Sequence, residues 1–70
     1  MFSEEEVRHF MDRLAEQWCN EHNTKGRMLQ LDEFDRWILL SEDENGNFVS
    51  VNLGHAAAIE KMMVERNESP

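Results

Sequence analysis

The beginning of the chain alternates apolar and polar positions with the period of an amphipathic helix. Apolar side chains recur every three or four residues, which places them on one helical face at about 100° per residue. They are Val7, Phe10, Met11, Leu14, Ala15 and Trp18. Ser3 and Glu6 have the spacing of a capping box, so we expect the helix to begin near residue 4. It should end in the polar segment 20–26, where Gly26 is available for a left-handed backbone position.

Two short runs around the pair Asn45-Gly46 predict a β-hairpin. The run before the pair favours a strand, and the run after it alternates apolar and polar side chains with period two. Asn-Gly favours a type I′ turn because both central residues of that turn need positive φ. With this pair at the turn centre, Leu40 would lie opposite Val51. The core-facing side of the hairpin would then carry Ile38, Leu40, Val49, Val51 and Leu53.

The segment before the hairpin is ambiguous. Residues 28–31 are a short apolar run, and the sequence does not decide whether they form a further strand. Residues 32–36 are polar apart from one aromatic side chain and suit a turn or a single helical turn. The sheet would therefore have two or three strands.

The end of the chain is rich in alanine and predicts a second helix, because alanine is the best helix former. We expect this helix to begin near residue 52 or 54, with Asn52 capping its first turn. Ile59, Met62 and Met63 form a narrow apolar stripe. Residues 67–70 are expected to form a frayed polar tail, whose Asn-Glu-Ser sequon matters only in an exported chain.

Together these elements predict an α+β fold in a single small domain, residues 1–66. It has an N-terminal amphipathic helix, a two- or three-stranded antiparallel sheet with an Asn-Gly hairpin, and a C-terminal helix, and the two helices form a second layer over one sheet face. The expected core consists of Phe10, Leu14, Trp18, Ile38, Leu40, Val49, Val51, Ile59 and Met62. So small a core rarely supplies more than about 5 kcal/mol without a staple, so a homodimer or a partner that completes the fold is a reasonable expectation.

The chain is strongly acidic, with 7 Lys and Arg against 15 Asp and Glu and a net charge of −8. The helix–strands–helix order resembles double-stranded-RNA-binding domains in outline, but those domains hold phosphates with a lysine cluster where this chain has His55-Ala56-Ala57-Ala58. Polyanions are bound by clustered cations, so we expect no direct contact with nucleic acid or anionic lipid. Such a surface favours a protein partner with a basic surface, although net charge also serves solubility alone.

The sequence favours a cytoplasmic protein without a membrane partner. No apolar run approaches the roughly 20 residues that a membrane-spanning helix needs. The amino terminus is acidic, whereas a secretory signal begins with basic residues. The single cysteine, Cys19, excludes an internal disulfide framework and suits a reducing compartment.

Residue types that carry catalysis or bind metals occur without the patterns that such chemistry needs. The sequence has no Gly-rich phosphate loop, nucleophile elbow or Cys-x-x-Cys pair. Residues 41–48 resemble part of an EF-hand loop, but Ser41 and Asn52 stand where the first ligand and the bidentate glutamate belong. Cys19 and His22 are three residues apart, but the helix provides only these two ligands, whereas a structural zinc site needs four. We expect neither an enzyme nor a bound cofactor.

Acidic side chains repeatedly stand beside aromatic ones, which is the composition of an interface with aromatic anchors and a charged rim. If the second face of the hairpin holds Trp37, Leu39 and Phe48, it is an apolar patch without an intramolecular cover. The alternative is that Trp37 and Phe34 complete the core. The candidate partner-binding residues are Phe34, Asp35, Trp37, Glu42, Asp43 and Glu44.

Two functions are compatible with these patterns. The first is a non-catalytic acidic module that binds a basic or nucleic-acid-handling protein, as an inhibitor or a mimic of the natural polyanion, a role that would suit a phage or a mobile element. The second is a structural or regulatory subunit that assembles through an apolar face, as a homodimer or hetero-oligomer, with the charge serving solubility only. Electrostatic binding weakens with salt and apolar assembly does not, so salt dependence separates the two.

Overall fold

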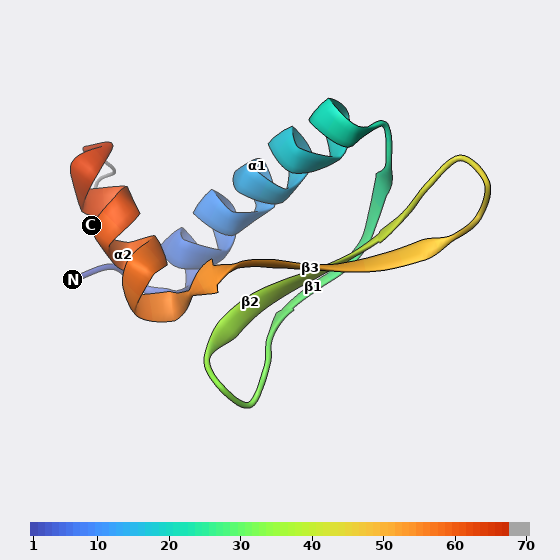
Figure 1. Ribbon diagram of the computed structural model, residues 1–70. Coiled ribbons are helices and arrows are strands. Elements are labelled where there is room, and N and C mark those ends of the chain that lie inside the picture. The colour runs from blue at the N-terminus through green and yellow to red at the C-terminus, as the bar shows by residue number, and fades with distance from the viewer. Residues whose placement is uncertain (68–70) are drawn as a thin grey trace.

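The computed structural model describes residues 1–67 and confirms an α+β fold (Figure 1). Along the chain it has α1 (Glu4–His22), β1 (Lys25–Leu31), β2 (Arg36–Glu42), β3 (Phe48–His55) and α2 (Ala56–Glu65). The strands form one antiparallel sheet in the order β1-β2-β3. The ambiguous residues 28–31 belong to β1, so the sheet has a third strand.

Helix α1 begins where the sequence predicts. The Glu6 N–H donates to Ser3 Oγ at 3.1 Å, and the Ser3 N–H donates to Glu6 Oε1 at 2.9 Å, which completes the capping box. The hydrogen bond from the Ser3 backbone, followed by that with its hydroxyl, lowers the pKa of Glu6. At the other end the left-handed residue is Asn23, with φ of 55°, whereas Gly26 lies within β1. The expectation for Gly26 is therefore wrong, because asparagine also tolerates this conformation.

The pairing of β2 with β3 differs from the predicted register by one residue. Leu39, rather than Leu40, lies opposite Val51. The Gly46 N–H donates to the Asp43 carbonyl at 3.0 Å, so the central residues of the turn are 44 and 45. Gly46 has φ of 80°, but residue 45 has no positive φ, and the predicted type I′ turn is wrong. A one-residue slip moves every side chain of one strand to the opposite face of the sheet.

The slip changes which side chains of β2 enter the core. Trp37, Leu39 and Ser41 are buried on the side of α1, whereas Ile38 and Leu40 are half-buried on the opposite side. The prediction that Ile38 and Leu40 belong to the core is therefore wrong, as is the prediction of an uncovered face carrying Trp37 and Leu39. The buried core consists of Phe10, Met11, Ala15, Cys19, Leu29, Trp37, Leu39, Ile59 and Met63.

The face that α1 presents to the core also differs from the expected one. Met11, Ala15 and Cys19 are buried at steps of four residues. Four other residues predicted in the core are only partly buried at its margin, namely Leu14, Trp18, Val51 and Met62. Val49 is exposed. The apolar stripe of α1 is wide enough to fill the core with one edge and leave the other edge at the surface.

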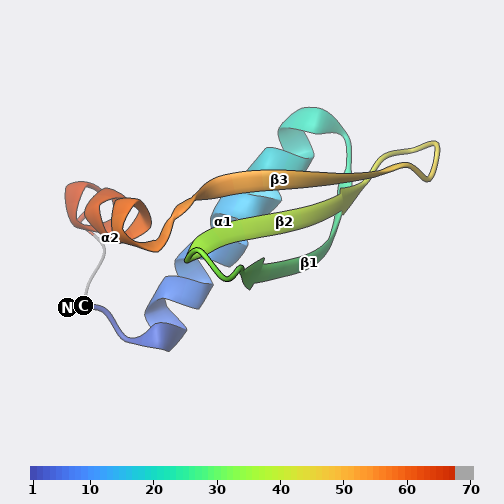
Figure 2. The ribbon, with the colours of Figure 1, turned by 60° about the horizontal axis from the view of Figure 1, so that its bottom comes forward.

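Helix α2 begins at Ala56, two residues after the later of the two expected starts, and Asn52 is not its cap. Its cap is His55, whose Nδ1 accepts from the Ala57 N–H at 3.0 Å, while Asn52 Oδ1 accepts from the Gly54 N–H at 2.9 Å. Helix α1 lies across one face of the sheet, whereas α2 lies beside the end of β3 (Figure 2). The predicted second layer, in which both helices cover the same sheet face, is therefore not confirmed. Residues 68–70 of the expected tail, which include most of the sequon, lie outside the described residues.

Candidate functional site

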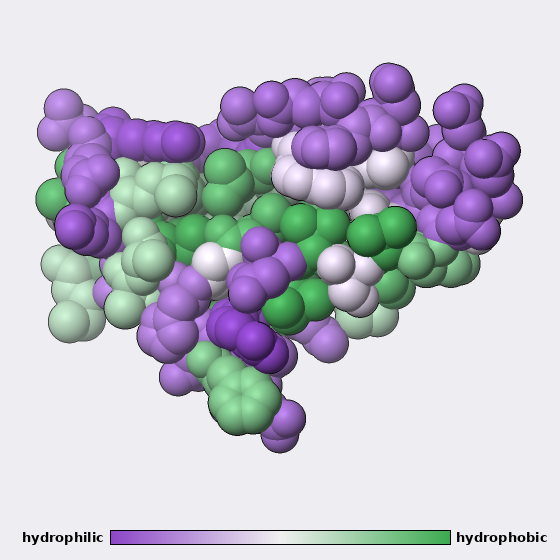
Figure 3. Space-filling model, viewed as in Figure 1, coloured by the Kyte–Doolittle hydropathy of each residue, from purple (hydrophilic) through white to green (hydrophobic). Residues whose placement is uncertain are grey.

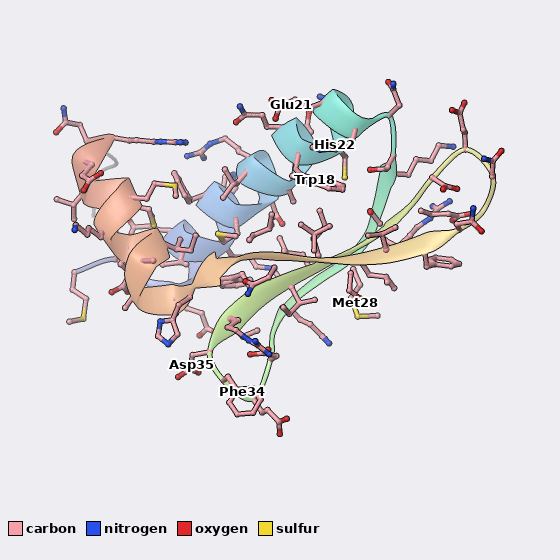
Figure 4. All side chains as sticks on the ribbon, viewed as in Figure 1. Trp18, Glu21, His22, Met28, Phe34 and Asp35 are labelled. Carbon is pink, nitrogen blue, oxygen red and sulfur yellow. The ribbon has the colours of Figure 1, made fainter. Side chains whose placement is uncertain are left out.

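The side of the sheet away from α1 is the first candidate surface, and we call it the open face. Within residues 1–67 no helix packs over it, and Figure 4 shows Met28 pointing out from this side. Met28 is 51% exposed and Phe48 59% exposed, and Ile38 and Leu40 lie half-buried between them. The register places Met28, Gln30, Ile38, Leu40, Phe48, Ser50 and Asn52 on this face. The open face therefore carries an apolar strip across all three strands.

An ion pair lies at each end of this apolar strip. At one end Arg36 Nη2 lies 2.7 Å from Asp32 Oδ2, and at the other Arg27 Nε lies 2.8 Å from Glu42 Oε1. Arg27 reaches Glu42 from a bulge in β1 between residues 26 and 28. Since six residue steps of β2 separate the two ends, the pairs are about 20 Å apart at about 3.4 Å per residue.

The first acidic turn joins β1 to β2 through residues 32–36. Asp32 Oδ1 accepts from the N–H groups of Phe34 and Arg36, each at 2.9 Å. Desolvation acts to raise the pKa of Asp32, but the hydrogen bonds from Arg36 and Phe34 and the charge of Arg36 outweigh it, so the pKa is lowered. Asp35 is exposed beside them. The lowered pKa keeps the Asp32 carboxylate ionised at neutral pH.

The second acidic turn joins β2 to β3 through residues 43–47. Asp43 Oδ1 accepts from the N–H groups of Asn45 and Asn47, at 2.9 and 2.8 Å. The Asn47 backbone hydrogen bond is the main cause that lowers the pKa of Asp43; desolvation opposes it, and the Asn45 N–H and the Asn47 amide support it. Glu44 is exposed at the tip. The carboxylate of Asp43 is thus already held by its own turn, which is not the arrangement of an EF-hand ligand.

The arginine side chains are held by groups within the molecule. The sequence has five arginines. Four guanidinium groups lie over aromatic rings at 5.1 to 5.7 Å from the ring centroid: Arg8 over Trp37, Arg13 and Arg66 over Phe10, and Arg36 over Phe34. The fifth, Arg27, binds Glu42. A cation over an aromatic face is attracted to the ring quadrupole, so these four guanidinium groups favour contact with the protein's own rings.

The structure divides the predicted partner-binding residues into three groups. Trp37 is 6% exposed and belongs to the core, so it cannot anchor a partner in this conformation. Phe34, 63% exposed, and Asp35 lie at the tip of the first turn (Figure 4). Glu42, Asp43 and Glu44 lie at the opposite end of β2. Within this last group only Glu44 is exposed, and Glu42 and Asp43 are half-buried. The two groups outside the core flank the open face, whose residues Met28, Ile38 and Leu40 the sequence-based set omits.

A groove between α1 and β3 is the second candidate surface. Its apolar lining residues are Leu14, Trp18, Val51, Leu53 and Met62, and its polar ones are Gln17, Glu21, Asn52 and Arg66. Figure 3 shows a hydrophobic band along the length of β3, below the hydrophilic outer surface of α1. At the end of α1 the His22 ring stacks on Trp18, with centroids 4.0 Å apart and planes 14° apart (Figure 4). The His22 Nδ1 atom also lies 2.8 Å from the Trp18 carbonyl oxygen.

The residues considered for metal binding do not come together in the described part of the chain. Cys19 is buried in the core, and His22 faces Trp18. Across residues 1–67 no cluster of three or more His, Cys, Asp and Glu side chains is placed to hold a metal ion. Neither α1 nor α2 is long and apolar enough to cross a membrane.

Comparison of the chain with protein-family models, curated proteins and solved structures gives no match.

Proposed function

We propose that the protein is a non-catalytic docking module that binds a basic protein surface through its open face. One observation supports this proposal above the others: an uncovered apolar strip lies between two acidic turns. Exposed apolar patches with polar rims mark interaction sites, and a complementary charged rim fixes the register of the partner. The strip is formed by Met28, Ile38, Leu40 and Phe48.

The charge distribution indicates the chemistry of the partner. Glu33 and Asp35 are exposed at one end of the strip and Glu44 at the other. A complementary segment has apolar side chains in its centre and Lys or Arg at both ends, about 20 Å apart by the length of β2. If that basic surface normally holds nucleic acid, docking excludes the nucleic acid, so the module acts as an inhibitor that replaces a polyanion.

The experiment is capture of partners from cell extract on the immobilised protein at about 50 mM and about 300 mM salt, followed by affinity measurement with the purified partner. The double variant Glu33→Lys, Glu44→Lys reverses one exposed charge at each end of the strip. We expect it to weaken binding about tenfold at low salt. Phe48→Ser removes an exposed apolar side chain and should weaken binding at both salt concentrations.

The matched control is Glu16→Lys, Glu65→Lys, which changes the net charge equally but lies on the outer surfaces of α1 and α2, where both side chains are exposed. This control should bind nearly as the wild type does. Equal weakening by both double variants, or binding that ignores salt, would contradict docking on the open face. Asp43 and Glu42 are unsuitable for this test because each supports the fold through Asn47 or Arg27.

A second candidate function is favoured by a different observation. The groove beside β3 contains five apolar residues next to polar ones, and β3 itself contains no Asp, Glu, Lys or Arg. A structural or regulatory subunit would assemble through such a surface, and the net charge of −8 would serve solubility. Assembly of this kind persists or strengthens as salt rises, opposite to the docking of a basic partner.

A further inference from the structure

Strand β3 is an unpaired edge of the sheet, and it lacks the features with which proteins usually block such an edge. Edge strands are commonly protected by charged side chains, proline or bulges. The other edge, β1, carries Lys25, Arg27 and a bulge at residues 26–28. Between residues 48 and 52, β3 has no charge, no proline and no bulge, because its irregularity lies further along, at residue 53.

The backbone of this segment has hydrogen-bonding groups that β2 does not use. In an antiparallel pair, residues that bond to the neighbouring strand alternate with residues that do not. The Asp43 N–H donates to the Asn47 carbonyl at 2.9 Å, which fixes the start of the alternation. It follows that the N–H and C=O groups of Phe48, Ser50 and Asn52 point away from β2. These three alternate residues therefore offer free backbone donors and acceptors along the outer edge of β3, where one more antiparallel strand can pair.

The sequence of the segment is complementary to itself. A two-fold axis at Ser50 would pair each Ser50 with its copy and each Phe48 with Asn52 of the second molecule. On the side of α1 it would pair Val49 with Val51, two β-branched residues that favour cross-strand packing. Val49 is exposed and Val51 is partly buried at the edge of the groove. Pairing would therefore cover apolar surface that one chain leaves open.

Charge also selects this segment as the contact between two copies. Each chain carries −8, so two copies repel wherever acidic surfaces approach each other. The segment 48–52 is a stretch of the sheet without any ionisable side chain. The groove beside it contains one acidic and one basic residue, Glu21 and Arg66, so it adds no net negative charge to the contact. A closed two-fold contact is also the commonest form of soluble oligomer.

We infer that the protein forms a homodimer in which two β3 strands pair antiparallel about Ser50, giving one six-stranded sheet. The inference rests on the second candidate function and names a second copy of the chain as the partner in that assembly. The pairing leaves the open faces of both copies on the same side of the joined sheet. It requires no other partner, so its failure and the failure of the docking proposal are distinguishable.

The test is sedimentation equilibrium of the purified full chain over a wide concentration range. The expected mass rises from 8.3 kDa to twice that value as concentration increases. Because like-charged subunits repel and salt screens the repulsion, we expect the dissociation constant to fall several-fold between about 50 mM and about 500 mM salt. A monomer at every concentration and salt would overturn the inference.

Two variants locate the contact. Ser50→Pro removes an N–H that points away from β2, and Ser50→Lys places two like charges opposite each other at the two-fold axis. Each should abolish the dimer, while circular dichroism reports an intact fold. The control Gln30→Lys makes the same change of charge on the open face of β1 and should leave the dimer intact. A dimer that Gln30→Lys disrupts and Ser50→Lys does not would place the contact elsewhere and refute the pairing of β3.

Discussion

The two turns of the sheet are built in the same way from different sequences. In each, an aspartate at the first position accepts backbone N–H groups from the third and fifth residues through one carboxylate oxygen. The fourth N–H donates to the first carbonyl, and the first N–H donates to the fifth carbonyl. The fourth residue is left-handed in both, Asp35 with φ of 58° and Gly46 with φ of 80°. An Asp at the start of a turn thus suffices to organise its backbone locally.

The difference between the turns lies in what each one contacts. The Ala56 N–H donates to the Asp35 carbonyl at 2.8 Å, which ties the first turn to the start of α2. The second turn projects from the sheet at the opposite end (Figure 1). Arg36 also lies over the ring of Phe34 in the first turn, 5.1 Å from its centroid. Local sequence therefore sets the shape of both turns, and one tertiary hydrogen bond joins the first turn to the C-terminal helix.

The largest expected effect comes from breaking the tie between the first turn and α2. Ala56→Pro removes the N–H that bonds to Asp35, while proline suits the first residue of a helix and His55 already has the extended backbone that proline requires before it. We expect the free energy of unfolding in denaturant to fall by up to about 1.5 kcal/mol, the net contribution of one hydrogen bond, because Asp35 is exposed and water can replace the lost donor. The control Ala56→Ser keeps the N–H and should stay close to the wild type. An unchanged free energy of unfolding in Ala56→Pro would show that the hydrogen bond to Asp35 does not stabilise the first turn relative to the second.

A smaller effect is expected from the left-handed residues. Gly46→Ala should lower the free energy of unfolding by about 1 kcal/mol, because an L-residue adopts this conformation at a cost. The cost is one of backbone conformation alone, since the nearest atom to the added Cβ, Glu42 Oε2, is 3.9 Å away. Asp35→Ala should cost less, because a Cβ is already present there, and Asp35→Gly should stabilise by less than about 1 kcal/mol. Denaturant unfolding of the three variants tests this order, which equal losses at both positions would contradict.

The smallest effect concerns pH. The folded-state pKa values of Asp32 and Asp43 are both lowered, so their contribution to stability is complete above the pKa of the unfolded chain and is lost as pH falls through the folded values. Asp32→Asn and Asp43→Asn keep a side-chain acceptor but cannot titrate. Each should flatten the dependence of unfolding free energy on pH between about pH 6 and pH 2. Asp32→Asn should flatten it more because Asp32 also pairs with Arg36, and the reverse order would show that the ion pair adds nothing.

Local signals in the sequence predicted those parts of the fold that depend on neighbours along the chain. The capping box of Ser3 and Glu6 gave the start of α1, and period-two alternation gave β3. The register of β2 could not be found in this way, because Asn45-Gly46 fits both a two-residue turn and the longer turn that Asp43 organises. The choice depends on the burial of Trp37 and Leu39 in the same core cluster as Met11 and Ala15 of α1, which is tertiary packing.

The candidate interaction surface was predicted in its charge and not in its geometry. Phe34, Asp35 and Glu44 are exposed as an interface needs. Their separation to opposite ends of β2, and the apolar strip between them, depend on the register and were not foreseen. One signal in the sequence does point to this register: both turns begin with Asp-Glu, and the aspartates lie four and five residues before the next strand. Aligning those two pairs would have placed Ile38 and Leu40 on the open face.

The hydrogen bond between Ala56 and Asp35 also divides the molecule by the ease with which its parts open. Amides of the projecting β2–β3 turn can exchange with solvent through fraying confined to that loop. Helix α2 packs on the core through its own residues Ile59 and Met63. Because the β1–β2 turn is bonded to the start of this helix, we expect its amides to open together with α2 as one cooperative unit.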